Sequence, residues 1–236
     1  MPLTAGCTGS PIKLTPGDLF VTHMKRIITI IVLCLFPLSA YCLSDREAFE
    51  LLLQKSQEIK QFPFHVYITP DYAGFKGVPL PVSSYGFFAR AYEVLNDDKL
   101  PDEIFATFQF SQGTRWRCFL LRVPGMYAIE AIDIWIFDTE QNTWQRPMKI
   151  AERWGDAGYL IDVQAWIEDV NNDGWFDIVR RTLEKNIDLE DPRLPTTTST
   201  QNNVFVWDKD HFKDVSREYS PQLKFKNYRF NEEGKK

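Results

Sequence analysis

The sequence predicts a mainly β protein with antiparallel strands, organised as two related sheet units and preceded by one N-terminal helix that follows a signal peptide. Side chains alternate with period two in several segments beyond residue 87, which is typical of antiparallel strands. A similar order of segments occurs twice, which indicates an internal repeat. The 236 residues, of which 44% are hydrophobic, are long enough to bury a sizeable core.

The first forty-two residues do not fit the β pattern. A basic start at Met24-Lys25-Arg26 precedes a short apolar run over Ile27–Phe36, and the small residue Ala40 follows. This order is typical of a secretory signal peptide, and the run is too short to cross a bilayer as a helix. We therefore expect 24–42 to be a signal peptide and 1–23 to be upstream sequence read from a misplaced start. The mature form is expected to be periplasmic or secreted, with no transmembrane segment.

Two cysteines bear on the exported form. Ser39-Ala40-Tyr41-Cys42 resembles a bacterial lipobox, but Tyr41 stands where that motif needs a small residue, so we expect no lipid anchor at Cys42. Cleavage after Ala40 would leave Cys42 free to pair with Cys118 in an oxidising compartment, whereas cleavage after Cys42 would leave Cys118 alone. Cys118 lies in a strand-like run, which favours a buried and inert thiol.

Residues 43–86 are predicted to form the N-terminal helix and a segment rich in Pro and Gly. Ser44 and Glu47 have the spacing of a capping box, and the apolar positions that follow predict a helix of roughly 45–60. Within the Pro- and Gly-rich part, Phe64–Ile68 is a candidate short strand.

Residues 87–236 are predicted to be the β-rich domain, with quasi-repeats at about 93–150 and 160–219. Asn96–Ile104 aligns with Asn171–Val179, and Ile134–Asp138 with Val204–Asp208. Alternation marks strands at 104–110, 132–137 and 161–168. The polar stretch 188–203 separates two of the strands and is expected to be a functional or disordered loop, with composition favouring disorder from Thr196 to Asn203.

One segment has the spacing of a metal loop. Oxygen-bearing side chains occupy positions 1, 3, 5 and 9 of the run 169–177, and Gly174 follows at position 6. Calcium prefers six to eight oxygen ligands, and alternate residues of a tight loop can direct their side chains to one point. The residue at position 12 is Arg180 instead of the glutamate of an EF-hand. The alternative is an Asx-rich turn without metal. The expected ligands are Asp169, Asn171, Asp173 and Asp177, with the carbonyl of Trp175.

The run 169–177, followed by a strand, resembles the calcium loop of FG-GAP/VCBS-type repeats, which occur in β-propellers and in smaller exported bacterial β proteins. Trp154-Gly155 is similar to the Phe-Gly of that motif. The resemblance implies propeller-like sheet units, and two units are too few for a complete propeller. In the first repeat Val94 and Lys99 replace the first Asp and the Gly, which implies a loop without metal. A more general likeness to exported lysozyme-inhibitor-like proteins implies an inhibitor or immunity role.

Motifs for catalysis are scarce. The exported form has two histidines, His65 and His211, and the sequence contains no Gly-x-Ser-x-Gly element, Gly-rich phosphate loop or zinc spacing. A pair of carboxylates for glycoside hydrolysis is the remaining enzymatic alternative. Its members would come from Glu130, Asp133, Asp156, Asp162 and Glu168. Trp135 and Trp166 are candidates for sugar stacking, although a second packed layer is the favoured interpretation.

The sequence therefore predicts an exported, non-catalytic, calcium-binding protein that binds a protein partner or an envelope component. Loss of Lys13, Lys25, Arg26 and Asp18 with the leader changes the net charge from −5 to −7. An acidic protein gives no reason to expect nucleic acid as a partner, and it suits a basic, cell-wall-directed enzyme. The alternatives are a cell-envelope hydrolase that uses paired carboxylates and a structural or adhesion module.

Overall fold

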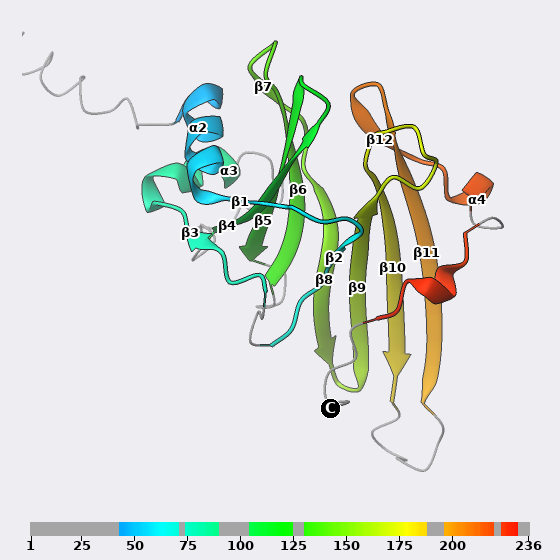
Figure 1. Ribbon diagram of the computed structural model, residues 1–236. Coiled ribbons are helices and arrows are strands. Elements are labelled where there is room, and N and C mark those ends of the chain that lie inside the picture. The colour runs from blue at the N-terminus through cyan, green and yellow to red at the C-terminus, as the bar shows by residue number, and fades with distance from the viewer. Residues whose placement is uncertain are drawn as a thin grey trace, which may run out of the picture. The chain divides into compact units, whose positions relative to one another are not determined.

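The computed structural model describes residues 43–70, 74–89, 104–124, 130–187, 196–219 and 223–230. Its described strands form one continuous sheet that is not closed, in the order β1-β4-β5-β6-β8-β9-β10-β11-β12 (Figure 1). The elements are α2 (Asp45–Lys55), β1 (Gln57–Glu58), β2 (Phe64–Val66), β3 (Val78–Pro79), η2 (Val82–Ser84), α3 (Tyr85–Ala89), β4 (Phe105–Gln112), β5 (Trp116–Pro124), β6 (Glu130–Asp138), β7 (Thr143–Trp144), β8 (Met148–Asp156), β9 (Tyr159–Glu168), β10 (Asp177–Asn186), β11 (Thr197–Asp208), β12 (His211–Asp214), α4 (Ser216–Tyr219) and η3 (Phe225–Asn227).

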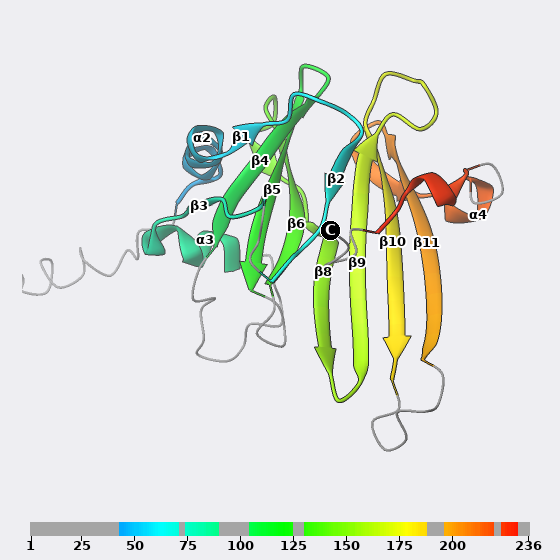
Figure 2. The ribbon, with the colours of Figure 1, turned by 60° about the horizontal axis from the view of Figure 1, so that its bottom comes forward.

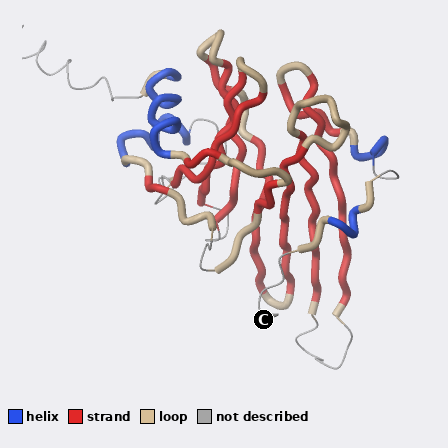
Figure 3. The backbone as a smooth tube through the Cα atoms, in the orientation of Figure 1, coloured by secondary structure: helices blue, strands red, loops and turns tan. Residues whose placement is uncertain are grey.

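The mainly β, antiparallel prediction is confirmed. Strands far outnumber helices in the described part of the chain (Figure 3), and the long neighbours from β4 to β12 all pair antiparallel. The exception is β1, which pairs parallel with β4 over two residues. The proposed signal peptide and upstream extension, and the aligned part of the first repeat from Asn96 to Glu103, lie outside the described residues.

Helix α2 begins at a complete capping box. Ser44 accepts the backbone N–H of Glu47, while the Glu47 carboxylate accepts the N–H of Ser44 at 2.8 Å. The predicted end near residue 60 is wrong, since the helix stops at Lys55 and Ser56 is extended. Tertiary pairing explains the difference, because the next residues form β1 along the edge of β4. Ile59 then enters the core from an extended segment.

Helices α2 and α3 lie against one face of β4–β6, as Figures 1 and 2 show. Phe49 of α2 stacks on Phe137 with ring centroids 4.3 Å apart, and it meets Phe119 edge-on at 5.8 Å. Phe88 of α3 contacts Trp135 at 5.2 Å. Both faces of β6 are therefore buried, because the isoleucine row of the same strand faces the main core.

The main core lies on the opposite face of the sheet. It contains apolar residues of the seven strands β4, β5, β6, β8, β9, β10 and β11 together with residues from the N-terminal segment. They are Ile59, Val66, Ile68, Phe75, Phe110, Trp116, Cys118, Leu120, Ile132, Ile134, Ile136, Ile150, Ala151, Ala165, Ile167, Ile178, Phe205 and Trp207. Cys118 is a fully buried free thiol, and burial raises its pKa, as the prediction of an inert cysteine requires. Cys42 lies outside the described residues.

Strand β4 departs from simple alternation. Its register against β5 shifts between Ala106, opposite Leu121, and Phe108, opposite Leu120. This one-residue irregularity places Ala106 and Phe108 on different faces of the sheet, whereas the regular alternation predicted for 104–110 would place them on the same face. Thr107 donates its hydroxyl to the carbonyl of Leu120 at 2.7 Å, which satisfies polar groups at the shift.

Strand β2 fills a gap beside β9. The β8 partners of β9 extend from Tyr159 to Val163, and beyond them β2 pairs with Ala165–Ile167. The predicted strand at Phe64–Ile68 therefore exists but ends at Val66. His65 of β2 stacks on Trp166 at 4.3 Å.

The tryptophans proposed for sugar stacking are both buried. Trp135 is 2% exposed and Trp166 is 7% exposed. Tyr228 of the C-terminal segment contacts Trp166 at 5.5 Å on the face that also carries His65. The prediction of a second packed layer is confirmed for these two residues.

The expectation of a disordered loop from Thr196 to Asn203 is wrong. Residues Thr197–Asn203 are the first half of β11 and pair with β10 along their full length. Threonine favours strands, and β10 continues to Asn186, so it provides a partner for each of these polar residues. Asp188–Pro195 lies outside the described residues. No helix among the residues placed by the structure is long and apolar enough to cross a membrane.

Candidate calcium loop

The run 169–177 connects β9 to β10 at one end of the sheet. Two of its residues have left-handed backbone, Asn172 with φ of 61° and Gly174 with φ of 87°. Asparagine and glycine tolerate this conformation best, so the sequence suits two reversals within a few residues. The reversals fold the loop onto itself and bring Asp169, Asn171 and Asp173 into one hydrogen-bonded group.

The side-chain oxygens at the first positions of the loop accept hydrogen bonds from within the loop. Asp169 accepts the backbone N–H of Asp173 on Oδ1 at 3.1 Å and that of Gly174 on Oδ2 at 2.9 Å. Asn171 Oδ1 accepts the N–H of Asp173 at 3.0 Å, while Asp173 accepts from Trp175 N and Asn171 Nδ2. Each of these oxygens uses one lone pair and retains a second.

Asp177 closes the loop from inside the protein. Its side chain is fully buried, with Oδ2 accepting the N–H of Val170 at 3.0 Å and Oδ1 accepting that of Trp207 at 2.9 Å. Burial raises the pKa of Asp177 to about 6, and the nearby charges of Asp173 and Asp169 add to the rise, although the two N–H donors oppose it. A neighbouring cation would favour the ionised form.

Two aromatic residues anchor the loop to the first half of the sheet. Phe176 donates its N–H to Gln112 Oε1 at 2.9 Å, and the amide of Gln112 donates back to the Phe176 carbonyl at 2.5 Å. The ring of Phe176 stacks on Phe62 at 3.7 Å. Trp175 covers Gly113 in the β4–β5 turn so closely that a Cβ there would lie 2.6 Å from its ring. The loop thus contacts a hairpin that is 64 residues away in sequence, measured from Phe176 to Gln112.

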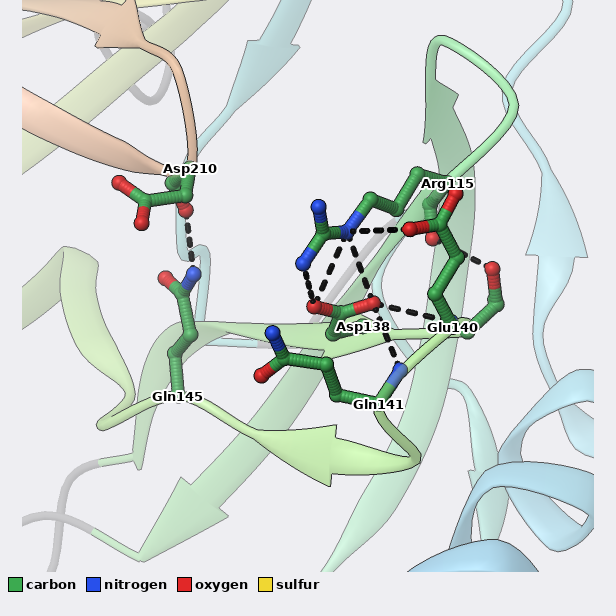
Figure 4. Close-up of polar contacts among 7 residues, drawn as sticks. Arg115, Asp138, Glu140, Gln141, Gln145 and Asp210 are labelled. Carbon is green, nitrogen blue, oxygen red and sulfur yellow. Dashed lines mark hydrogen bonds and ion pairs between the residues drawn. The ribbon is translucent and has the colours of Figure 1, made fainter.

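A polar cluster fastens neighbouring turns at this end of the sheet. Arg115 forms an ion pair with Asp138, which is 1% exposed and also accepts the N–H groups of Glu140 and Gln141 (Figure 4). The hydrogen bonds to Arg115 hold the pKa of Asp138 below its usual range. The Gln145 amide donates to the carbonyl of Asp210, which links the segment between β7 and β8 to the β11–β12 turn (Figure 4).

Aromatic contacts continue this cluster to the loop. The Arg115 guanidinium lies 4.7 Å from the ring of Trp116, and Trp116 contacts Trp207 edge-on at 5.8 Å. Trp207 in turn stacks with Trp175 at 6.4 Å. The loop is therefore supported by β4, β5 and β11, and none of these supports was predicted. The Gln112-Gly113 turn is the one local signal that sequence reasoning could have used.

The loop has the donor chemistry for calcium, but its carboxylates do not converge. Among the described residues, no group of three or more acidic, histidine or cysteine side chains is placed to hold a metal ion. Calcium coordination would need the exposed side chain of Asp173 and that of Asp169 to turn toward Asp177. Carbonyl and carboxylate oxygens with an unused lone pair are nevertheless present at the predicted positions.

The resemblance to FG-GAP loops is limited to the loop. Trp154 and Gly155 lie on β8 opposite Ile161 and Leu160, at the other end of β9 from Asp169. Comparisons with protein-family models, with curated proteins and with solved structures found no match.

The acidic residues of the hydrolase alternative lie on three strands, β6, β8 and β9. Asp162 is 5% exposed and accepts the amide of Gln164 at 3.0 Å, and Glu168 accepts the hydroxyl of Tyr228. Asp133 is buried on β6, whereas Asp156 is exposed beside the β8–β9 turn. The side chain of Glu130 is not described. Asp162 and Glu168 share one strand six residues apart, which separates them by about 20 Å, whereas a hydrolytic pair requires about 5–9.5 Å.

Proposed function

We propose that this chain is an exported, non-catalytic binding protein whose 169–177 loop binds calcium and whose folded surface binds a protein partner. One observation carries the calcium part of the proposal. The loop ties β9 and β10 to the β4–β5 turn and to β11 through Gln112, Gly113 and Trp207. A cation that ordered this loop would hold together segments that are distant in the sequence.

The proposed role of calcium is structural. Extracellular calcium modules bind at about 10⁻⁴–10⁻³ M, and free calcium tenfold above the dissociation constant stabilises the folded state by about 1.4 kcal/mol. Bound calcium would neutralise the repulsion between Asp177 and the carboxylates of Asp169 and Asp173. It would also restrain the turn at Gly174. The same proposal includes a relation between the sheet units of this chain and propeller-like repeats. It is supported by the way β6 and β11 each end in an aspartate and turn into a short strand.

The calcium prediction concerns thermal unfolding. In about 10 mM Ca²⁺, tenfold above the weaker affinity limit, the melting temperature should exceed that in EGTA by about 3–6 °C for a chain of this length. Asp173→Ala should abolish the difference, because it removes a proposed ligand whose side chain is exposed. Differential scanning calorimetry measures both effects.

Asp156→Ala is the matched control, since this exposed aspartate lies beside another turn of the same sheet. It should keep the full calcium-dependent shift. An unchanged melting temperature for the wild-type protein in calcium, or an equal shift in the Asp173→Ala variant, would refute the metal site.

For the partner, we propose a basic, cell-wall-directed hydrolase of the lysozyme-like class. The support is electrostatic, because the exported form carries a net charge of −7 after removal of the leader. Opposite net charges accelerate association and make it sensitive to salt. Added in slight excess, the protein should slow the clearing of a peptidoglycan suspension by such an enzyme.

The inhibition should weaken as salt rises from about 50 to 500 mM, since added ions screen the attraction. The protein alone should leave the suspension turbid. If the protein alone clears the suspension and Glu168→Gln abolishes this activity, the result would instead establish the paired-carboxylate hydrolase. Absence of inhibition across a panel of basic hydrolases would contradict the proposed partner class.

A further inference from the structure

The two outer edges of the sheet differ in how they are covered by neighbouring strands. At one edge, β4 is covered by two short strands, β1 at Phe108 and Gln109 and β3 at Phe105 and Ala106. At the other edge, β12 covers β11 only from Phe205 to Asp208. Among the described residues, no strand pairs with Thr197–Asn203 on the side away from β10. Figures 1 and 2 show this part of β11 at the outer margin of the sheet.

The backbone direction along this edge follows from Val204. Its carbonyl accepts the N–H of Val215 at 2.9 Å, and its N–H is donated to Ser216 Oγ at 2.9 Å. Val204 therefore directs both backbone groups away from β10. Because this direction repeats every second residue of a strand, Asn202, Thr200 and Thr198 direct theirs to the open edge.

The side chains of this edge lack the usual protection against pairing. Thr197–Gln201 are exposed, and the stretch from Thr196 to Asn203 contains neither a charged residue nor a proline. Natural edge strands are commonly protected by charges, prolines, bulges or a covering segment. Along the rest of this edge β12 pairs with Phe205–Asp208 and Ser216 bonds Val204, so Thr197–Asn203 is the part of it that no described strand covers.

We propose that this edge pairs with the same edge of a second copy of this chain, in an antiparallel dimer whose two-fold axis passes between the two Thr200 residues. In this register Thr198 faces Asn202 of the second copy, and all three outward-directed residues exchange main-chain hydrogen bonds, about six in total. Such a contact is self-complementary, as two-fold symmetry requires.

The chemistry of the strand selects a second copy as the occupant. An antiparallel strand that meets itself places each residue opposite a residue of the same short stretch and the axial residue opposite its own copy, so a charge at the axis would face its own sign. Here the opposed pairs are neutral, with threonine opposite threonine at the axis, a pair that is favourable across strands. The edge lies at the end of β11 away from Asp208 and the calcium loop, so the dimer does not depend on the proposed function.

Sedimentation velocity of the full exported chain tests the dimer over about 1–200 μM, the range expected for a contact smaller than a standard interface. The wild-type protein should shift from monomer to dimer as concentration rises. Thr200→Lys should remain monomeric, because two lysines would meet at the axis. Thr200→Pro should do the same while it retains the β10 pairing, since the N–H that it removes points outward. Val82→Lys alters the large hydrophobic residue that is most exposed in the described part of the chain, at 72%, and should dimerise like the wild type.

A cysteine pair tests the register. Under mild oxidation Thr200→Cys should form a covalent dimer, because residues exchanging hydrogen bonds across the axis have Cα atoms about 5.5 Å apart, within disulfide range. Ser199→Cys should crosslink several-fold less, as it would face Gln201 on the other sheet face. A wild-type monomer throughout, a dimer that survives Thr200→Lys, or equal crosslinking of the two cysteine variants would overturn the proposal. Binding of an unrelated extended peptide to a monomeric chain would overturn it as well.

Discussion

Asp177→Ala should destabilise the folded protein by about 3 kcal/mol when no calcium is present. The carboxylate accepts the N–H groups of Trp207 and Val170 from two different parts of the chain. Its removal leaves both donors without their acceptor, at about 1–3 kcal/mol for each buried group. Relief of the repulsion from Asp173 and Asp169 recovers part of this loss. Urea unfolding in EGTA, followed by tryptophan fluorescence, measures the change.

Asp173→Ala is the comparison within the same loop. Its side chain is exposed and its hydrogen bonds stay local, so in EGTA the loss should be under about 1 kcal/mol. The two variants separate the scaffold role of the loop from its proposed metal role. Similar losses in EGTA for Asp173→Ala and Asp177→Ala would mean that the buried carboxylate does not tie the loop to β11.

Gly113→Ala should destabilise the protein by about 2–5 kcal/mol, the sum of two costs. Gly113 has φ of +60°, a conformation that costs a residue with a Cβ about 1–2 kcal/mol. The new Cβ would also lie 2.6 Å from the ring of Trp175, and overpacking of this kind typically costs about 1–3 kcal/mol. Trp175 is held by its stacking on Trp207, so the ring cannot move without disturbing the loop.

Gly74→Ala separates these two costs. Gly74 has φ of +84°, but nothing lies within 4 Å of a Cβ built there. It should therefore show only the backbone cost, and its calcium response should equal that of the wild-type protein. The Gly113→Ala variant should also show a changed near-ultraviolet circular dichroism spectrum, because Trp175 must shift. Equal destabilisation by both substitutions would show that Trp175 does not press on the β4–β5 turn.

Local sequence patterns predicted several of the main elements of this fold but not their lengths. Alternation predicted the strands that became β4, β6 and β9, and the Ser44–Glu47 spacing predicted the start of α2. The errors have tertiary causes. Helix α2 ends early because Gln57 and Glu58 pair with β4, and the polar stretch before Val204 is a strand because β10 extends far enough to pair with it. The residue pattern of one segment does not show which strand will pair with that segment, and this pairing decides where α2 ends and where β11 begins.

In the candidate loop too, the sequence predicted some features and the tertiary structure decided the others. Its reversals at Asn172 and Gly174 follow from residue types whose backbone preferences are local, and its oxygen-bearing side chains were identifiable by spacing alone. The burial of Asp177 and the contact between Trp175 and Gly113 were not, since they depend on strands far away in sequence.

The sequence by itself determined the β character of the chain, the turns of the loop and the neutral composition of the Thr197–Asn203 stretch, because propensity, backbone preference and charge belong to individual residues. Only the tertiary structure decided that this stretch is an edge, that Trp135 and Trp166 are covered, and that the loop rests on β4, β5 and β11. Burial and strand pairing are relations between distant segments, and they exist only once the sheet has assembled.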